Sequence, residues 1–222
     1  MAFHLDKPEG FQFKAGQSVD LTLADPPESD AEGNTRTFSI ASAPGDQDIV
    51  VATRMRDTAF KRVLGSLPIG SPVQLEGPMG SFTLHHNAAK PAVLMAGGIG
   101  ITPFRSIIRQ ATAEKLAQKL YLFFGNNRPE DAPFIEDLQA LAAANPYFDF
   151  VPTMTDMARS ARPWSGETSV IGREMLLGRL SNLHGPIYYV AGPPGMVEAM
   201  HSMLVGAGID EDDVRAEEFA GY

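Results

Sequence analysis

The chain contains no cysteine. This absence excludes disulfide bonds, thiolate-held iron–sulfur clusters, cysteine-based zinc sites and any cysteine nucleophile. Positive charge is also scarce: the chain has 18 Lys and Arg residues against 27 Asp and Glu residues, which gives a formal net charge of −9. Such a surface repels phosphate backbones, so nucleic acid is not an expected partner.

Long apolar runs are missing as well. The longest, PAVLMAGGIGITPF (91–104), is shorter than the roughly 20 residues needed to cross a bilayer, and glycine and proline interrupt it. The first ten residues, MAFHLDKPEG, contain neither a basic stretch nor an apolar core, so no signal peptide is expected. We therefore expect a cytoplasmic protein without a membrane span.

The N-terminal part of the chain has the pattern of short β-strands. The alternating stretches are SVDLTL, RTFSIAS, DIVVATR and SPVQLEG, and turns rich in Gly, Pro and Asp separate them. This spacing predicts a small antiparallel, Greek-key barrel over residues 1–87. One amphipathic stretch, DTAFKRVLGSL (57–67), predicts a helix capped by Asp57 or Thr58.

The pattern changes from about residue 88. Apolar runs, namely AVLMA, KLYLFFG, FDFVPTM and IYYVAG, alternate with amphipathic stretches such as PFIEDLQALAAA and MVEAMHSMLVGAG. Runs that are apolar throughout and joined by helices predict a parallel sheet covered on both faces. The expected fold is therefore a β-barrel (1–87) followed by a parallel-sheet, Rossmann-like α/β domain (88–222).

A glycine-rich segment, GGIGITP (97–103), lies where the first parallel strand meets the first helix. Ligands of open α/β sheets bind at this carboxyl edge. We expect Thr102 to cap the helix and Pro103 to begin it, while the glycines let the backbone approach an anion. The segment matches neither a P-loop nor G-x-G-x-x-G, so a tight turn without a ligand is an equal alternative for this segment taken alone.

Five segments occur in order along the chain. They are RTFS (36–39), EGPMGSF (76–82), GGIGITP (97–103), YYVAGPPGM (188–196) and EEFAGY (217–222). Together they resemble the ferredoxin–NADP reductase family of flavin-dependent oxidoreductases, over nearly the whole chain. The resemblance implies an FAD-binding barrel (1–87) and an NAD(P)-binding domain (88–222) whose C-terminal tail returns to the flavin.

The resemblance also implies an activity. Hydride would pass from NAD(P)H to the flavin, FAD being favoured over FMN, and electrons would then leave to a separate acceptor such as a ferredoxin, a flavodoxin-like protein or an oxygenase. No metal is expected. Two alternatives stay open: a non-catalytic flavin- or nucleotide-binding sensor of the same fold, and an α/β nucleotide-binding module without flavin.

Family motifs assign the flavin contacts. The resemblance places Arg36 on the flavin diphosphate, Phe38 against the isoalloxazine ring and Ser39 at its N5 atom. Phe38 stands where the family usually has tyrosine, so the phenol's hydrogen bond is lost. By itself, an exposed Arg36 with a core Phe38 would be the simpler interpretation. The other predicted flavin contacts are Thr37, Met55, Thr58, Ala59, Phe60, Phe219 and Tyr222.

The chain end supplies further catalytic candidates. Glu217 and Phe219 match the spacing of a family glutamate that assists electron or proton transfer and an aromatic ring that shields the flavin. With Ser39, they are the predicted catalytic residues. The alternative is that VRAEEF is only a last strand with a frayed tail.

Contacts to the nicotinamide cofactor are expected at the strand ends. Arg128 suits a 2′-phosphate and favours NADP over NAD by a small margin. Ala191 replaces the family's cysteine beside the reacting nicotinamide carbon, which favours slow hydride transfer or the sensor alternative. The full set of candidates is Gly97, Gly98, Ile99, Gly100, Thr102, Pro103, Asn126, Asn127, Arg128, Ala191, Gly192, Pro193, Pro194 and Met196.

Overall fold

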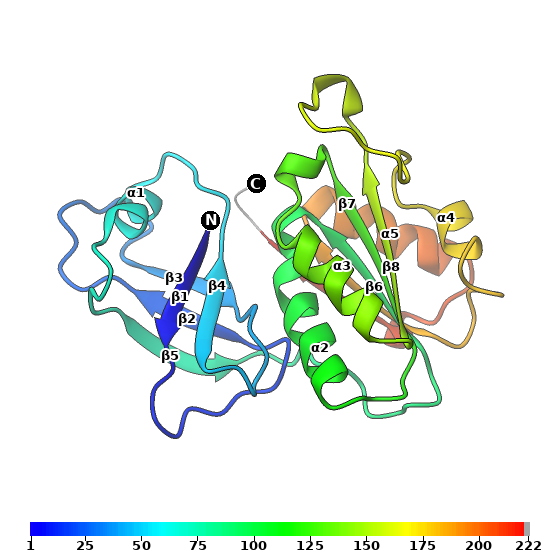
Figure 1. The fold of residues 1–222 in the computed structure, drawn as a ribbon, viewed down its shortest axis with the longest axis horizontal. Coiled ribbons are helices and arrows are strands. Elements are labelled where there is room, and N and C mark those ends of the chain that lie inside the picture. Colours follow the sequence, from blue (N-terminus) through cyan, green and yellow to red (C-terminus); the bar gives the residue numbers. More distant parts are fainter. Residues whose placement is uncertain (220–222) are drawn as a thin grey trace.

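The computed structural model describes residues 1–219. Two bodies lie side by side in it, an all-β body from the N-terminal part of the chain and an α/β body from the remainder (Figure 1). The chain passes from one to the other between β5 (Gln74–Met79) and β6 (Ala92–Gly97). Tyr222, a predicted flavin contact, lies outside the described residues.

The all-β body, within residues 1–79, consists of two small antiparallel sheets. Its elements are β1 (Ala2–Asp6), β2 (Ser18–Thr22), β3 (Thr35–Ser39), β4 (Asp48–Ala52), α1 (Ala59–Ser66) and β5. Strand β1 pairs with β4, while β3, β2 and β5 form the second sheet in that order. Both sheets and α1 share one core that includes Val19, Ile49 and Phe60.

Helix α1 forms where the apolar spacing predicted it. Phe60, Val63 and Leu64 are buried on one face. The Thr58 hydroxyl accepts a hydrogen bond from the Lys61 N–H at 3.4 Å, so Thr58 is the N-cap, one of the two residues expected. The first turn of a helix has N–H groups without intrahelical partners, which makes this end a place where an anion can bind.

The α/β body, within residues 80–219, is built on a five-stranded parallel sheet in the order β10-β9-β6-β7-β8. The other strands are β7 (Leu120–Asn126), β8 (Phe148–Met154), β9 (Ile187–Gly192) and β10 (Val214–Glu218). The helices are α2 (Ile101–Ala113), α3 (Ile135–Ala144), α4 (Arg173–Leu177) and α5 (Pro194–Gly206). Short 3₁₀ turns are η1 (Gly98–Gly100), η2 (Pro129–Asp131), η3 (Met157–Arg159) and η4 (Glu211–Asp213).

Two cores lie on opposite faces of this sheet. Helices α2 and α3 cover one face, and α4 and α5 cover the other (Figure 1). Along β6, Leu94 belongs to the core with Phe104 of α2, and Met95 belongs to the core with Val197 of α5. Burial on both faces explains why these strands are apolar throughout, and the predicted fold class is confirmed.

Candidate functional site

A cavity of about 450 Å³ opens at the carboxyl edge of the parallel sheet. Residues from the ends of β6, β7 and β8 line it, together with the start of α5. After β6 the chain adds β7 and β8 on one side of that strand, then β9 and β10 on the other. The strand order therefore reverses at β6, and open α/β sheets bind their ligands beside such a reversal.

The glycine-rich turn after β6 packs tightly against the turn after β9. Gly98 has φ +52°, in the left-handed region that glycine adopts most easily. A Cβ atom on Gly100 would lie 2.3 Å from the Ala191 carbonyl oxygen. Glycine at position 100 is thus what lets the ends of β6 and β9 approach each other at the cavity.

The expected helix start at Thr102 and Pro103 is wrong. Helix α2 begins at Ile101 with Gly100 as N-cap, because turn η1 leads directly into it. Thr102 and Pro103 are buried in the first turn, and the Thr102 hydroxyl donates to the Ile99 carbonyl at 3.1 Å. The start of α2 still carries backbone N–H groups beside the glycine turn, so its attraction for an anion is unchanged.

Asn126, the last residue of β7, is an unusual feature of the cavity. Its side chain is only 6% exposed, and neither Oδ1 nor Nδ2 has a hydrogen-bond partner among residues 1–219. Leaving one buried polar group unpaired costs about 1–3 kcal/mol. Since Asn126 lines the cavity, a bound molecule with both a donor and an acceptor would satisfy it.

The all-β body contributes Arg54 to the same cavity. Strand β4 ends at Ala52, so Arg54 lies in the irregular segment between β4 and α1. The position of Arg54 brings a positive charge from one body to a ligand cavity of the other.

Positive charges gather around the start of α1. Burial lowers the pKa of Lys61, and the charges of Arg56 and Arg36 lower it further. Burial, followed by the charges of Arg54 and Lys61, likewise lowers the pKa of the N-terminal amine of Met1. Mutually repelling cations beside a helix N-terminus fit an anionic group such as the diphosphate of FAD.

Only part of the predicted flavin motif on β3 is accessible to a ligand. Phe38 is 8% exposed and lies in the core, with its ring centroid 6.1 Å from that of Phe60. Ser39 is 6% exposed. Thr37 is exposed and its hydroxyl donates to Asp20.

Arg36 is engaged by the loop that precedes β3. Its guanidinium donates to the carbonyl oxygens of Glu32, Gly33 and Thr35, and to the Asp30 carboxylate at 3.2 Å. The same group lies over the ring of Phe60, 5.0 Å from the centroid. A bond from Arg36 to a diphosphate would have to replace part of this network.

The C-terminal segment VRAEE forms strand β10, as the sequence pattern predicts, and the end of the tail lies outside the described residues. The Phe219 N–H donates to the Gly192 carbonyl at 3.0 Å, which brings the predicted aromatic shield beside the turn after β9. Glu217 lines a second cavity, about 580 Å³, together with Ser18, Ser81 and Arg215. Its Oε2 is buried without a hydrogen-bond partner in the described chain, and burial raises its pKa.

Six of the fourteen coenzyme candidates line the cavity at the sheet edge. Within the set predicted for NAD(P), those that line the cavity are Gly97, Gly98, Asn126, Asn127, Pro193 and Met196. Arg128 does not line it. Its guanidinium binds Asp131 at 2.6 and 3.0 Å, so its charge is already compensated and supports NADP less than expected.

Sequence reasoning missed several residues of the cavity. Thr153 and Thr155 follow the pattern of the others, because they lie at the carboxyl end of β8. The end of the third apolar run was the signal that could have identified them. The remaining missed residues are Arg54, Gly125, Val170, Ile171, Ala199 and Met200.

Comparison with known proteins shows which proteins the chain resembles. Residues 94–202 match the model of the oxidoreductase NAD-binding domain. Ferredoxin–NADP reductase B of Sorangium cellulosum is 28% identical over 228 residues, covering 99% of this chain and 90% of that protein. The chain therefore contains a match to an oxidoreductase NAD-binding domain and is similar along its length to a ferredoxin–NADP reductase.

Other relatives of the chain are longer proteins. The reductase component of propane 2-monooxygenase from Rhodococcus jostii is 26% identical and covers 96% of this chain, but the chain spans only 57% of it. The chain spans a similar share, little more than half, of other curated relatives. Among solved structures, a ferredoxin NADP⁺ reductase from Neisseria gonorrhoeae with bound FAD and NADP has the same fold, with a TM-score of 0.77 at 23% identity, covering 98% of this chain and 91% of that one.

Among residues 1–219, no helix has both the length and the apolar character needed to cross a membrane.

Proposed function

We propose that the protein is an NAD(P)H-dependent flavoprotein reductase. The coenzyme binds in the cavity at the carboxyl edge of the parallel sheet, FAD binds the all-β body beside α1, and electrons leave to a separate acceptor protein. The observation that carries this proposal is the unpartnered, 6% exposed Asn126 in a cavity to which the other body supplies Arg54. The names of the relatives, a ferredoxin–NADP reductase and an oxygenase reductase component, support this activity and both classes of acceptor.

Bound FAD would supply the redox chemistry, accepting a hydride and releasing one or two electrons. The chain's own residues bind and orient. The positive N-terminal end of α2 attracts the phosphate of the coenzyme, and Asn126 holds a neutral polar group of the coenzyme. Cations beside α1 hold the second diphosphate. Burial raises the pKa of Glu217, which favours the protonated form of its carboxyl group relative to an exposed glutamate.

The experiment that tests this function is reduction of the flavin by the coenzyme in the absence of oxygen. Purified protein, reconstituted with FAD, is expected to be yellow and to bleach when NADH or NADPH is added. A yellow protein that bleaches with neither coenzyme would favour the sensor alternative. A protein that takes up no FAD would contradict the flavin assignment altogether.

Asn126→Leu is expected to weaken coenzyme binding while the protein becomes no less stable. The substitution removes two unpartnered buried polar atoms and keeps a similar volume, which is neutral or stabilising in a fold without ligand. The same change removes about two hydrogen bonds to the coenzyme, each worth about 1 kcal/mol, so the coenzyme Kd should rise roughly 10–30-fold. Calorimetric titration and thermal unfolding measure the two effects.

Asn182→Leu is the matched control, because it makes the same substitution at an exposed asparagine that does not line the cavity. Its coenzyme Kd is expected to change less than threefold. If Asn126→Leu bound coenzyme normally but were less stable than the parent, Asn126 would contribute to the stability of the fold and not to coenzyme binding.

A further inference from the structure

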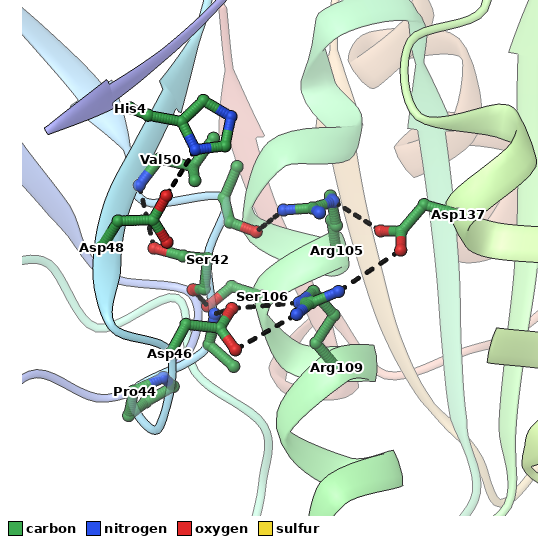
Figure 2. A network of polar contacts seen from close by, with 12 residues as sticks. His4, Ser42, Pro44, Asp46, Asp48, Val50, Arg105, Ser106, Arg109 and Asp137 are labelled. Carbon is green, nitrogen blue, oxygen red and sulfur yellow. Dashed lines mark hydrogen bonds and ion pairs between the residues drawn. The ribbon is translucent and has the colours of Figure 1, made fainter. Parts of the chain in front are cut away.

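A polar bridge joins the two bodies between α2 and the loop 41–46 (Figure 2). The Ser106 hydroxyl donates to the Ser42 carbonyl at 2.6 Å, and both residues are fully buried. One turn away along α2, the Arg109 guanidinium donates two hydrogen bonds to the Asp46 carboxylate, at 3.0 and 3.1 Å. We call this set the α2 bridge; its members are Ala41, Ser42, Asp46, Arg105, Ser106, Arg109 and Asp137.

A second layer holds the two arginines of the bridge in place. Asp137 of α3 accepts from Arg105 Nε at 2.7 Å and from Arg109 at 3.3 Å (Figure 2). Arg105 also donates to the Ala41 carbonyl at 2.7 Å. Each guanidinium is therefore bonded on both sides, which fixes its direction as well as its contact.

The ionic part of the bridge is charged at neutral pH. Burial alone would raise the pKa of Asp46, but hydrogen bonds from Arg109 and the Ala43 amide outweigh it and lower the pKa below its ordinary value. The hydrogen bond to Asp46 in turn raises the pKa of Arg109. Charge-assisted pairs of this kind are directional, and removing one partner leaves the other poorly compensated.

The place of the bridge in the chain matters more than its strength. Loop 41–46 follows Ser39, the last residue of β3 and of the predicted flavin motif, after a single intervening residue. Helix α2 begins directly after the Gly98–Gly100 turn of the coenzyme cavity. The bridge thus connects loop 41–46, which continues from the flavin motif on β3, with α2, which continues from the glycine turn of the coenzyme cavity.

We propose that the α2 bridge sets the distance and orientation between the coenzyme site and the flavin site, with Asp46 and Arg109 as positioning residues. This inference rests on the proposed function. Hydride transfer needs the reacting atoms about 3–3.5 Å apart, and a misplacement of 1 Å can lower the rate about 100-fold. Loosening the bridge changes the relation between the two sites and leaves intact the contacts that each body makes with its own ligand, while Arg54, which reaches the coenzyme cavity from the all-β body, shifts with that body.

Asp46→Asn is the first test. The rate of flavin reduction, measured in a single turnover by stopped flow, is expected to fall 10–100-fold, while the FAD content and the coenzyme Kd change less than twofold. Arg109→Gln should have the same effect, and the double variant should lose no more than either single variant. Arg109→Lys keeps a charged bond to Asp46 and should recover most of the rate.

Arg179→Gln is the matched control, because Arg179 pairs with Asp149 at 3.8 Å within the α/β body alone. It should leave the rate unchanged. A fall in FAD content or coenzyme affinity that parallels the fall in rate would overturn the inference, since it would place Asp46 in a binding site or in the stability of the fold.

Distance measurement between spin labels provides a readout that needs no activity. The chain has no cysteine, so Ile69→Cys on the all-β body and Gln139→Cys on α3 are labelled without background. We expect one narrow distance distribution in the parent and a broader or shifted one with Asp46→Asn. An unchanged distribution would overturn the inference. A broadened distribution in a protein that neither coenzyme reduces would leave the bridge standing and reject the proposed function.

Discussion

Gly100→Ala is expected to abolish coenzyme binding and to leave flavin uptake intact. The new Cβ would lie 2.3 Å from the Ala191 carbonyl oxygen, 2.5 Å from its carbon and 2.7 Å from the Gly192 nitrogen. All three atoms belong to backbone, so no side chain can rotate to relieve the overlap, and the turns after β6 and β9 must separate. We expect the coenzyme Kd to rise at least ~100-fold. Overpacking should also lower the free energy of unfolding by about 1–3 kcal/mol.

Flavin content provides the internal control for this prediction, because the cationic start of α1 is in the other body. Gly195→Ala is the matched variant. Gly195 lies in the first turn of α5, and a Cβ there would meet nothing within 4 Å. It should bind coenzyme normally and be slightly more stable, since alanine favours helix. Coenzyme binding within threefold of the parent in Gly100→Ala would contradict a binding role for the turn.

Periodicity was enough to predict the fold. Strand β6 is buried on both faces, and its unbroken apolar run predicts a strand of a parallel sheet that is covered on both faces. Helix α1 is predicted from one apolar face and a cap at Asp57 or Thr58. These features are local, because the residues that decide them are neighbours in the chain.

The site was predicted less completely, since its contacts are distant in sequence. Nothing in the spacing of RTFS shows that loop 30–35 folds back and binds Arg36. Arg128 suggested a phosphate contact because its partner Asp131, three residues later, looked like any solvated acid. The α2 bridge was not predicted at all, because Asp46 and Arg109 are 63 residues apart and each resembles an ordinary surface charge.

Glu217→Gln is expected to lower turnover while raising stability at alkaline pH. Glutamine keeps the shape of the side chain but cannot release a proton from this position, and general acid–base catalysis is typically worth 10²–10⁴-fold. We therefore expect turnover to fall about 100-fold or more. Steady-state rates with a soluble one-electron acceptor measure this effect, and the coenzyme Kd should stay unchanged.

The stability effect follows from the sign of the pKa shift. Burial raises the pKa of folded Glu217, so the folded state keeps its proton at pH values where the unfolded chain, with a pKa of about 4.3, has lost it. The contribution of Glu217 to stability is full below about pH 4.3 and is lost as the pH rises toward the folded pKa. The parent and Glu217→Gln should thus unfold at similar temperatures near pH 4. At pH 8 the variant should be more stable than the parent. A gain of ~1 kcal/mol would correspond to ~2–4 °C in Tm for a chain of this size.

Glu218→Gln separates this effect from a general change of charge on β10. Glu218 is the next residue, is exposed, and points to the opposite side of the strand, so the substitution removes the same charge without touching a buried carboxyl group. It should alter neither turnover nor the dependence of Tm on pH. A Glu217→Gln protein that is less stable than the parent at pH 8 would contradict the raised pKa of Glu217, because replacing a carboxylate that burial destabilises should not weaken the fold.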